Sequence, residues 1–147
     1  MPWRPSPYLH GHLVVVIDCA DLDRAARFWT GVLGYRDRDR DRDPEPGPEP
    51  GPEPGPGQYR ALLPVDGSGI EVLLQRTADP KHGKNRVHLD LRTRHLDTEV
   101  SRVTALGATV LTSQPIIEDD WVWHVLADPD GNEFCVLQPP PAYWRDR

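Results

Sequence analysis

The sequence predicts an α+β fold in which two βαβββ modules form a curved mixed sheet, a cup around a shared cavity with the helices on the outside. Three observations predict it. Two amphipathic helices, 22–33 and 96–106, both open on Leu-Asp and close on Leu-Gly, and each follows a strand and precedes further strands. Both halves end on similar apolar strands. One half alone would leave a sheet face bare, whereas two halves side by side cover each other.

The first module is predicted to span residues 12–76. Its opening strand, 12–18, contains the β-branched run Val14 to Ile17, which is typical of a strand buried on both faces. Asp21 is a good N-cap for helix 22–33, and Gly34 supplies its C-terminal stop. Strands 58–64 and 70–76 are predicted to form a hairpin across the Asp-Gly-Ser-Gly turn at 66–69.

An insert of low complexity, residues 36–57, interrupts this module. It contains no aliphatic or aromatic residue, opens with alternating Arg and Asp, and continues with three copies of Glu-Pro-Gly-Pro. Its seven prolines argue against helix and sheet. We expect a tolerated surface loop without function, with a lid over the cavity or an interaction segment as alternatives.

The second module is predicted at 86–138, after a polar linker at 77–85. Strand 86–92 alternates, so that Val87 and Leu89 share one face while His88 and Asp90 share the other. Strands 109–112, 121–126 and 133–138 follow its helix, and a tight turn at 128–131 joins the last two. Residues 1–11 are assigned to an N-terminal extension and 139–147 to a C-terminal tail.

Charge and cysteine usage exclude several classes of partner. A net charge of −6 with scattered basic residues argues against nucleic acid. The apolar run at 13–17 is too short for a signal peptide or a membrane span. Cys19 and Cys135 form no Cys-x-x-Cys pair, so we expect reduced thiols and a cytoplasmic protein. The remaining partner is a small-molecule ligand.

Three segments carry a family resemblance: DCADLDRAARFWTGVLGY, KNRVHLDLRTRHLDTEVSRVTALGATV and ADPDGNEFCVLQP. Together they resemble the glyoxalase-like branch of the glyoxalase/bleomycin resistance/dioxygenase (vicinal oxygen chelate) superfamily. The resemblance implies a cup of paired modules, a homodimer, and up to four metal ligands, which fall on Val14, Glu71, His88 and Cys135. Val14 cannot ligate a metal and Cys135 replaces a carboxylate, so true glyoxalase I activity is not expected.

The candidate site residues are chosen from these positions and from the strand faces that alternation turns toward the expected cavity. Glu71 and His88 are the catalytic candidates, and with Cys135 they are the candidate ligands of a divalent metal (Zn, Ni, Fe or Mn), although no cofactor is required. Zinc suits a Glu, His and Cys set with water as fourth ligand. The candidate ligand-binding residues share a place on the expected cavity face: Gln75, Asp90, Trp123, Cys135 and His12.

Three functions remain open at this point, and the choice between enzyme and binding protein is open with them. The first is a small-molecule binding protein, because tryptophans accompany an incomplete ligand set. The second is a metal-dependent lyase, isomerase or dioxygenase of the superfamily that uses Glu71 and His88. The third is an interaction protein that uses the insert. The sequence names no substrate.

Overall fold

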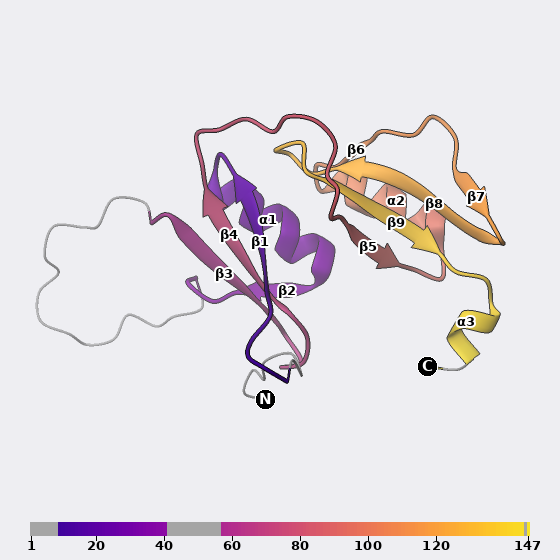
Figure 1. Ribbon diagram of the computed structural model, residues 1–147, viewed down its shortest axis with the longest axis horizontal. Coiled ribbons are helices and arrows are strands. Elements are labelled where there is room, and N and C mark those ends of the chain that lie inside the picture. Colours follow the sequence, from indigo (N-terminus) through magenta and orange to yellow (C-terminus); the bar gives the residue numbers. More distant parts are fainter. Residues whose placement is uncertain (1–8, 41–56, 146) are drawn as a thin grey trace, which may run out of the picture. The chain divides into compact units, whose positions relative to one another are not determined.

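The computed structural model describes residues 9–40, 57–145 and 147. The chain divides into two compact units, Met1–Pro80 and Lys81–Arg147 (Figure 1). This division falls inside the segment predicted as a linker, 77–85. Most of the N-terminal extension and residues 41–56 of the insert lie outside the described residues. A cavity shared by the two modules stays a prediction.

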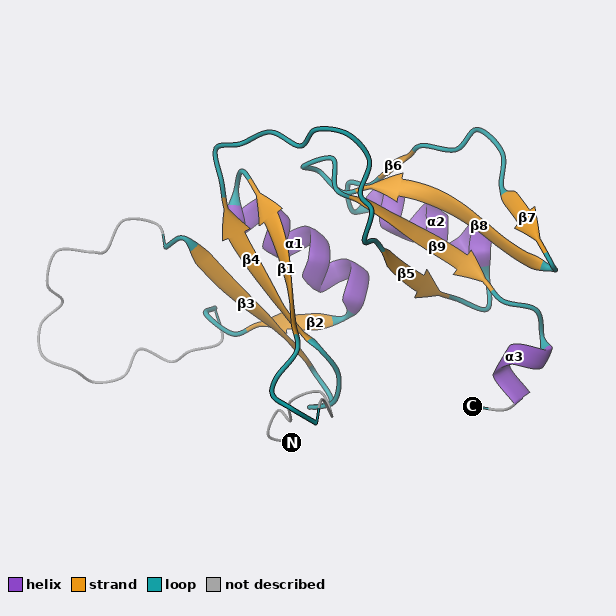
Figure 2. Cartoon of the chain, in the orientation of Figure 1, coloured by secondary structure: helices purple, strands orange, loops and turns teal. Residues whose placement is uncertain are grey.

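The first unit is a four-stranded sheet with one helix. In chain order its elements are β1 (Val14–Cys19), α1 (Leu22–Leu33), β2 (Tyr35–Asp37), β3 (Tyr59–Pro64) and β4 (Glu71–Arg76). The strand order is β1-β4-β3-β2, with β1 parallel to β4 and the other pairs antiparallel. Helix α1 lies across one face of this sheet (Figure 2). The predicted βαβββ module is therefore confirmed.

Helix α1 has the predicted bounds because both ends carry specific stop signals. The Asp21 carboxylate accepts a hydrogen bond from the Arg24 backbone N–H at 3.0 Å. Gly34 has φ of 68°, the left-handed conformation that glycine adopts without strain. Between the caps, Phe28 and Trp29 are almost fully buried, and their rings meet edge to face at 5.1 Å. The helix therefore packs its apolar stripe against the sheet.

Strand β1 differs from its prediction in bounds and in burial. It begins at Val14, so His12 lies before it and is exposed. Ile17 and Cys19 are buried on the α1 side, whereas Val16, on the other face, is 50% exposed. The expectation of burial on both faces is wrong within this unit, because α1, the one helix among its described residues, covers one face of the sheet.

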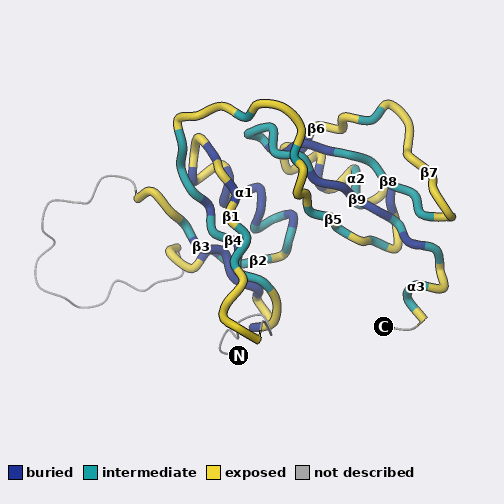
Figure 3. The backbone as a smooth tube through the Cα atoms, in the orientation of Figure 1, coloured by how far each residue is buried: buried dark blue, intermediate teal, exposed yellow. Residues whose placement is uncertain are grey.

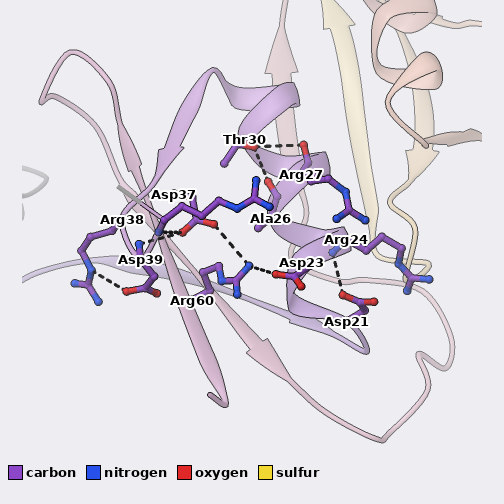
Figure 4. A network of polar contacts seen from close by, with 11 residues as sticks. Asp21, Asp23, Arg24, Ala26, Arg27, Thr30, Asp37, Arg38, Asp39 and Arg60 are labelled. Atoms are coloured by element: carbon purple, nitrogen blue, oxygen red, sulfur yellow. Dashed lines mark hydrogen bonds and ion pairs between the residues drawn. The ribbon is translucent and has the colours of Figure 1, made fainter. Parts of the chain in front are cut away.

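The start of the predicted insert is structured, which corrects its boundary. Arg36 and Asp37 pair with Leu63 and Leu62 in β2–β3. The buried Asp37 carboxylate accepts hydrogen bonds from the backbone N–H groups of residues 39 and 40, and it lies 3.7 Å from an Arg60 nitrogen (Figure 4). These contacts end the strand, so Arg36 and Asp37 belong to the sheet.

The second unit repeats the order of the first. Its elements are β5 (Leu89–Arg92), α2 (Leu96–Ala105), β6 (Thr109–Val110), β7 (Ile116–Glu118), β8 (Trp121–Ala127), β9 (Glu133–Gln138) and α3 (Ala142–Arg145). The strand order is β5-β9-β8-β6, with β5 parallel to β9 and β7 paired to β8. In both units the first strand pairs in parallel with the last strand of the sheet, and a helix follows the first strand. This shared topology confirms the predicted repeat.

Several bounds and elements of the second unit differ from prediction, and one is the strand expected at 109–112, which is only Thr109–Val110. The strand expected at 86–92 is only Leu89–Arg92, and Val87 is 89% exposed. Before β5, the Asn85 side chain donates to the Glu133 carbonyl at 3.3 Å, a side-chain contact at the edge of β9 just before the ladder begins. Strand β7 and helix α3 were not predicted. Strand β9 has its predicted bounds, 133–138.

The turn between β8 and β9 shows why the closing hairpin forms. The buried Asp128 carboxylate accepts hydrogen bonds from the backbone N–H groups of Asp130 (2.9 Å) and Asn132 (2.8 Å). Buried residues gather on one side of α1 and along β3 in the first unit, and along β9 in the second (Figure 3). Among the helices of the described residues, none has the length and hydropathy needed to cross a membrane.

Candidate functional site

A pocket of about 350 Å³ lies within the second unit, on one face of β5, β9 and β8. Strand alternation explains which residues reach it. Phe134 and Val136 are buried in the core, so the intervening Cys135 and Leu137 turn to the opposite face. The lining comes from β5 and its approach, the β7–β8 hairpin and β9: His88, Asp90, Glu118, Asp119, Trp121, Trp123, Cys135 and Leu137.

Four sequence-predicted site residues are brought together here: His88, Asp90, Trp123 and Cys135. Asp90 is opposite Cys135 in the β5–β9 register. His88 Nδ1 lies 3.4 Å from Asp90 Oδ1 and 4.0 Å from Cys135 Sγ. The three residues each offer a ligand atom, and these atoms lie within 4.8 Å of one another. His88 precedes β5, so it reaches the group from a loop.

Cys135 is the chemically perturbed member of this group. Burial raises the pKa of its thiol from 9.0 to about 11, and the nearby carboxylates of Asp90 and Glu133 add to the shift. The thiol is therefore protonated at neutral pH. Since the thiolate is the reactive form, Cys135 is a poor nucleophile in this setting. A bound cation would reverse that preference.

The part of the pocket that β8 lines is aromatic. Trp121 and Trp123 occupy alternate positions on β8, and Trp123 pairs with Leu137 across the β8–β9 ladder. The exposed carboxylates of Glu118 and Asp119 stand at the rim. The pocket therefore combines an apolar wall with acidic groups.

Sequence reasoning missed Glu118 and Asp119 because it missed β7. The β7–β8 connection is a two-residue turn in which Asp119 and Asp120 both have positive φ, 49° and 67°. Such hairpin turns favour Asn, Asp and Gly. The Asp-Asp pair between two apolar runs was the available signal, although it is weaker than Asn-Gly.

The remaining predicted residues lie in the first unit. Glu71 pairs with Val14 in the β1–β4 register, and it shares a strand face with Gln75. Val72 and Leu74, on the other face, are buried, as predicted. Gln75 lines a separate open depression, where its amide lies 3.5 Å from the Tyr59 hydroxyl. A site that combines Glu71 or His12 with the second unit stays a prediction.

Comparison with known proteins agrees with this architecture. A family model for the glyoxalase-like domain matches residues 14–137. Among curated proteins, none matches the chain. A glyoxalase/bleomycin resistance protein/dioxygenase family enzyme from Burkholderia phytofirmans PsJN has 18% identity and a TM-score of 0.61, covering 85% of this chain and 95% of its own.

Two fosfomycin resistance proteins are similar to the same degree. FosX from Mesorhizobium loti has 16% identity and a TM-score of 0.61, with 94% of this chain and 99% of that chain covered. FosX from Listeria monocytogenes has 12% identity and a TM-score of 0.62, with 92% and 98% covered. At these identities the likeness to solved structures concerns the fold alone.

Proposed function

The chain belongs to the glyoxalase-like domain family of the glyoxalase/bleomycin resistance/dioxygenase superfamily, and from this premise we propose that it binds a small, flat organic cation in the pocket of its second unit. The observation that carries the proposal is a pocket lining that combines the apolar side chains of Trp121, Trp123 and Leu137 with the carboxylates of Asp90, Glu118 and Asp119. A pocket of about 350 Å³ is in the range that holds small organic ligands.

The aromatic wall supports a flat ligand. Indole rings give large contact areas at low entropic cost, and they favour offset stacking or edge contacts with another ring. Both tryptophans are half-buried, so part of each ring stays accessible from the pocket. A planar ligand therefore gains more here than a branched aliphatic one of equal size.

The charge of the lining supports a cation. Asp90, Glu118 and Asp119 contribute carboxylates, and His88 is the basic side chain of the lining. Cations are also attracted to the faces of indole rings, by about 0.5–1 kcal/mol at exposed sites. Anionic ligands would meet repulsion from the rim, although salt screens that repulsion because the rim is exposed.

The test uses three bicyclic probes of similar shape: N-methylquinolinium, which is a permanent cation, neutral 2-methylquinoline, and anionic naphthalene-1-carboxylate. We expect calorimetric affinities in that order. Trp123→Ala should weaken all three, whereas Glu118→Gln should weaken only the cation. Tyr59→Ala, an aromatic truncation in the first unit, is the matched control. Equal affinity for all probes, or no effect of Trp123→Ala, contradicts the proposal.

A second candidate function is metal-assisted catalysis as a lyase, isomerase or dioxygenase, and it is favoured by the cluster of His88, Asp90 and Cys135. A tetrahedral zinc site places N, O and S donors about 3.3–3.6 Å apart. The separation of 3.4 Å between His88 Nδ1 and Asp90 Oδ1 matches that range, whereas Cys135 Sγ, 4.0 Å from His88 Nδ1 in a group whose ligand atoms lie within 4.8 Å, must move closer. The donor set therefore fits Zn²⁺ with one position left for water.

In this second candidate, His88, Asp90 and Cys135 would hold the ion, and Asp90 takes the place that the sequence prediction assigned to Glu71. A bound Zn²⁺ supplies a Lewis acid and acidifies its water. The chain's own contribution is a buried thiol that must release its proton on binding and a pocket wall that excludes solvent from one side. Ni²⁺, Fe²⁺ and Mn²⁺ fit less well, because a thiolate is a soft ligand.

Metal titration of the purified protein tests this second candidate. Co²⁺ bound to a thiolate gives a near-ultraviolet charge-transfer band, and we expect this band in the wild type but not in Cys135→Ser. Asp90→Asn should weaken Zn²⁺ binding about 10-fold or more, whereas Asp97→Asn, on helix α2, should leave it unchanged. Absence of the band, or its persistence in Cys135→Ser, refutes the site.

A cytoplasmic location and a homodimer complete the proposal. Both cysteines are buried and form no disulfide bond with each other, which suits a reducing compartment.

Exposed apolar residues on the second unit, including Leu111, Ile116 and Ile117, favour a contact with a second copy. Sedimentation of the wild type and of Ile117→Glu tests the dimer, since only the wild type should sediment as two chains.

A further inference from the structure

Trp121 both lines the pocket and contacts the C-terminal helix α3. It lines the pocket, and its ring also lies 5.5 Å from the ring of Tyr143, in α3, at an interplanar angle of 69°. It is the first residue of β8, directly after the turn at Asp119 and Asp120. On its own sheet, Trp121 pairs with Glu118 across the β7–β8 ladder. The contact with Tyr143 adds a neighbour from outside the sheet.

Arg92, the last residue of β5, contacts both Trp121 of β8 and Tyr143 of α3. Its guanidinium lies 5.2 Å from the centre of the Trp121 ring and 5.1 Å from the centre of the Tyr143 ring. The same side chain donates a hydrogen bond to the Tyr143 hydroxyl at 2.9 Å. Arg92 ends β5, two residues after Asp90 on the same strand face. One cation therefore connects three segments that are distant in the sequence.

The tail helix depends on these contacts for its place. A helix of four residues is too short to be stable by itself. Trp144 packs edge to face on Tyr143 with ring centres 4.8 Å apart, and Arg94 lies 4.6 Å from the centre of the Trp144 ring. Side-chain contacts, including the one with Trp121 of the pocket lining, thus dock α3 on the second unit. Removing the ring at position 143 removes the centre of this cluster.

We propose that Tyr143 is a positioning residue for the pocket: through its ring and its hydrogen bond with Arg92 it holds Trp121 in the orientation that receives the ligand. Because Arg92 lies over one face of the indole, the ligand meets the opposite face or the edge. The C-terminal tail is thereby part of the binding site without touching the ligand. The inference rests on the proposed function of this pocket.

The experiment follows Trp121 directly. Protein labelled with 5-fluorotryptophan is studied by ¹⁹F NMR, with the Trp121 resonance assigned from Trp121→Phe. In Tyr143→Ala we expect this resonance to shift or broaden while that of Trp29, buried in the first unit, stays in place. Affinity for N-methylquinolinium should fall about 3- to 10-fold, the range that corresponds to one lost aromatic pair.

Two variants control for a merely structural effect. Tyr143→Phe keeps the ring against Trp121 and loses only the hydroxyl, so it should recover most of the affinity and of the Trp121 signal. Tyr59→Ala removes an exposed tyrosine of the first unit and should change neither readout. Recovery by phenylalanine would support positioning through the ring.

The inference is overturned if Tyr143→Ala leaves the Trp121 resonance unmoved, or if it moves the resonance while the probe binds as in the wild type. Failure of the proposed function is a separate outcome. In that case the wild type itself binds none of the three bicyclic probes, and the ¹⁹F spectra of Tyr143→Ala still decide whether the tail orients Trp121.

Discussion

The reactivity of Cys135 provides the sharpest quantitative prediction. Its thiol is buried beside Asp90, and its pKa is raised from 9.0 to about 11, first by burial and then by the carboxylates of Asp90 and Glu133. Since only the thiolate reacts with iodoacetamide, we expect the alkylation rate of Cys135 to keep rising with pH until about 11. An exposed cysteine levels off about two pH units earlier.

The magnitude follows from two opposing effects. A pKa that is two units higher means about 100-fold less thiolate at about pH 8. A more basic thiolate is also a better nucleophile, which recovers about 10-fold. The net result is alkylation about 10-fold slower than for an exposed cysteine, before the restricted access to a buried side chain slows it further. Asp90→Asn removes one carboxylate, so the midpoint should move down while burial keeps it above 9.0.

Peptide mass spectrometry measures the rates of Cys19 and Cys135 separately in one digest, across a range of pH. Asp97→Asn is the matched control, since that carboxylate lies in the first turn of α2 and does not line this pocket. A midpoint near 9 for Cys135 in the wild type would refute the reasoning. So would a midpoint that Asp90→Asn fails to move.

Four further outcomes are expected. Zn²⁺ affinity, measured against a chromophoric chelator, should rise up to about tenfold per pH unit between about 7.5 and 9, because the Cys135 proton must leave; a flat profile contradicts thiolate ligation. Gly34→Ala should lower stability in urea unfolding by about 1–2 kcal/mol, since φ is 68° there and only backbone strain opposes a Cβ. Asp37→Ala should cost about 1–3 kcal/mol and Asp37→Asn less, because Asn keeps an acceptor for the turn; equal losses contradict this. Deleting residues 41–56 should leave N-methylquinolinium affinity unchanged, and a loss would support the lid or interaction alternatives.

Local patterns were sufficient for most of the fold. Helix α1 has its predicted bounds because Asp21 and Gly34 act through contacts with adjacent turns. The β3–β4 hairpin and the closing turn at Asp128 are likewise local. Strand β2 was missed because the alternating Arg and Asp resemble a solvated loop, and only pairing with β3 makes Arg36 and Asp37 part of a sheet.

The candidate site was partly accessible from the sequence. Alternation predicted that Cys135 and Leu137 share a strand face opposite Phe134 and Val136, and both residues line the pocket of the second unit. The two closing strands have similar sequences, yet the residues at matching letters face different ways: Val72 is buried in the core, whereas Cys135 turns to the pocket. Side-chain direction has a period of two along a strand, so a shift by one residue reverses the face.

What the sequence determined by itself is the repeat: two helices with matched ends, strands before and after them, and the turns that join the strands. These depend on capping, glycine conformation and apolar periodicity, all of which act within a few residues. The tertiary structure alone decided that Asp90, rather than Glu71, offers a ligand atom near those of His88 and Cys135, that Asp119 lines the pocket, and that Tyr143 packs on Trp121. Those contacts depend on strand register and on the docking of a four-residue helix, which no local pattern specifies.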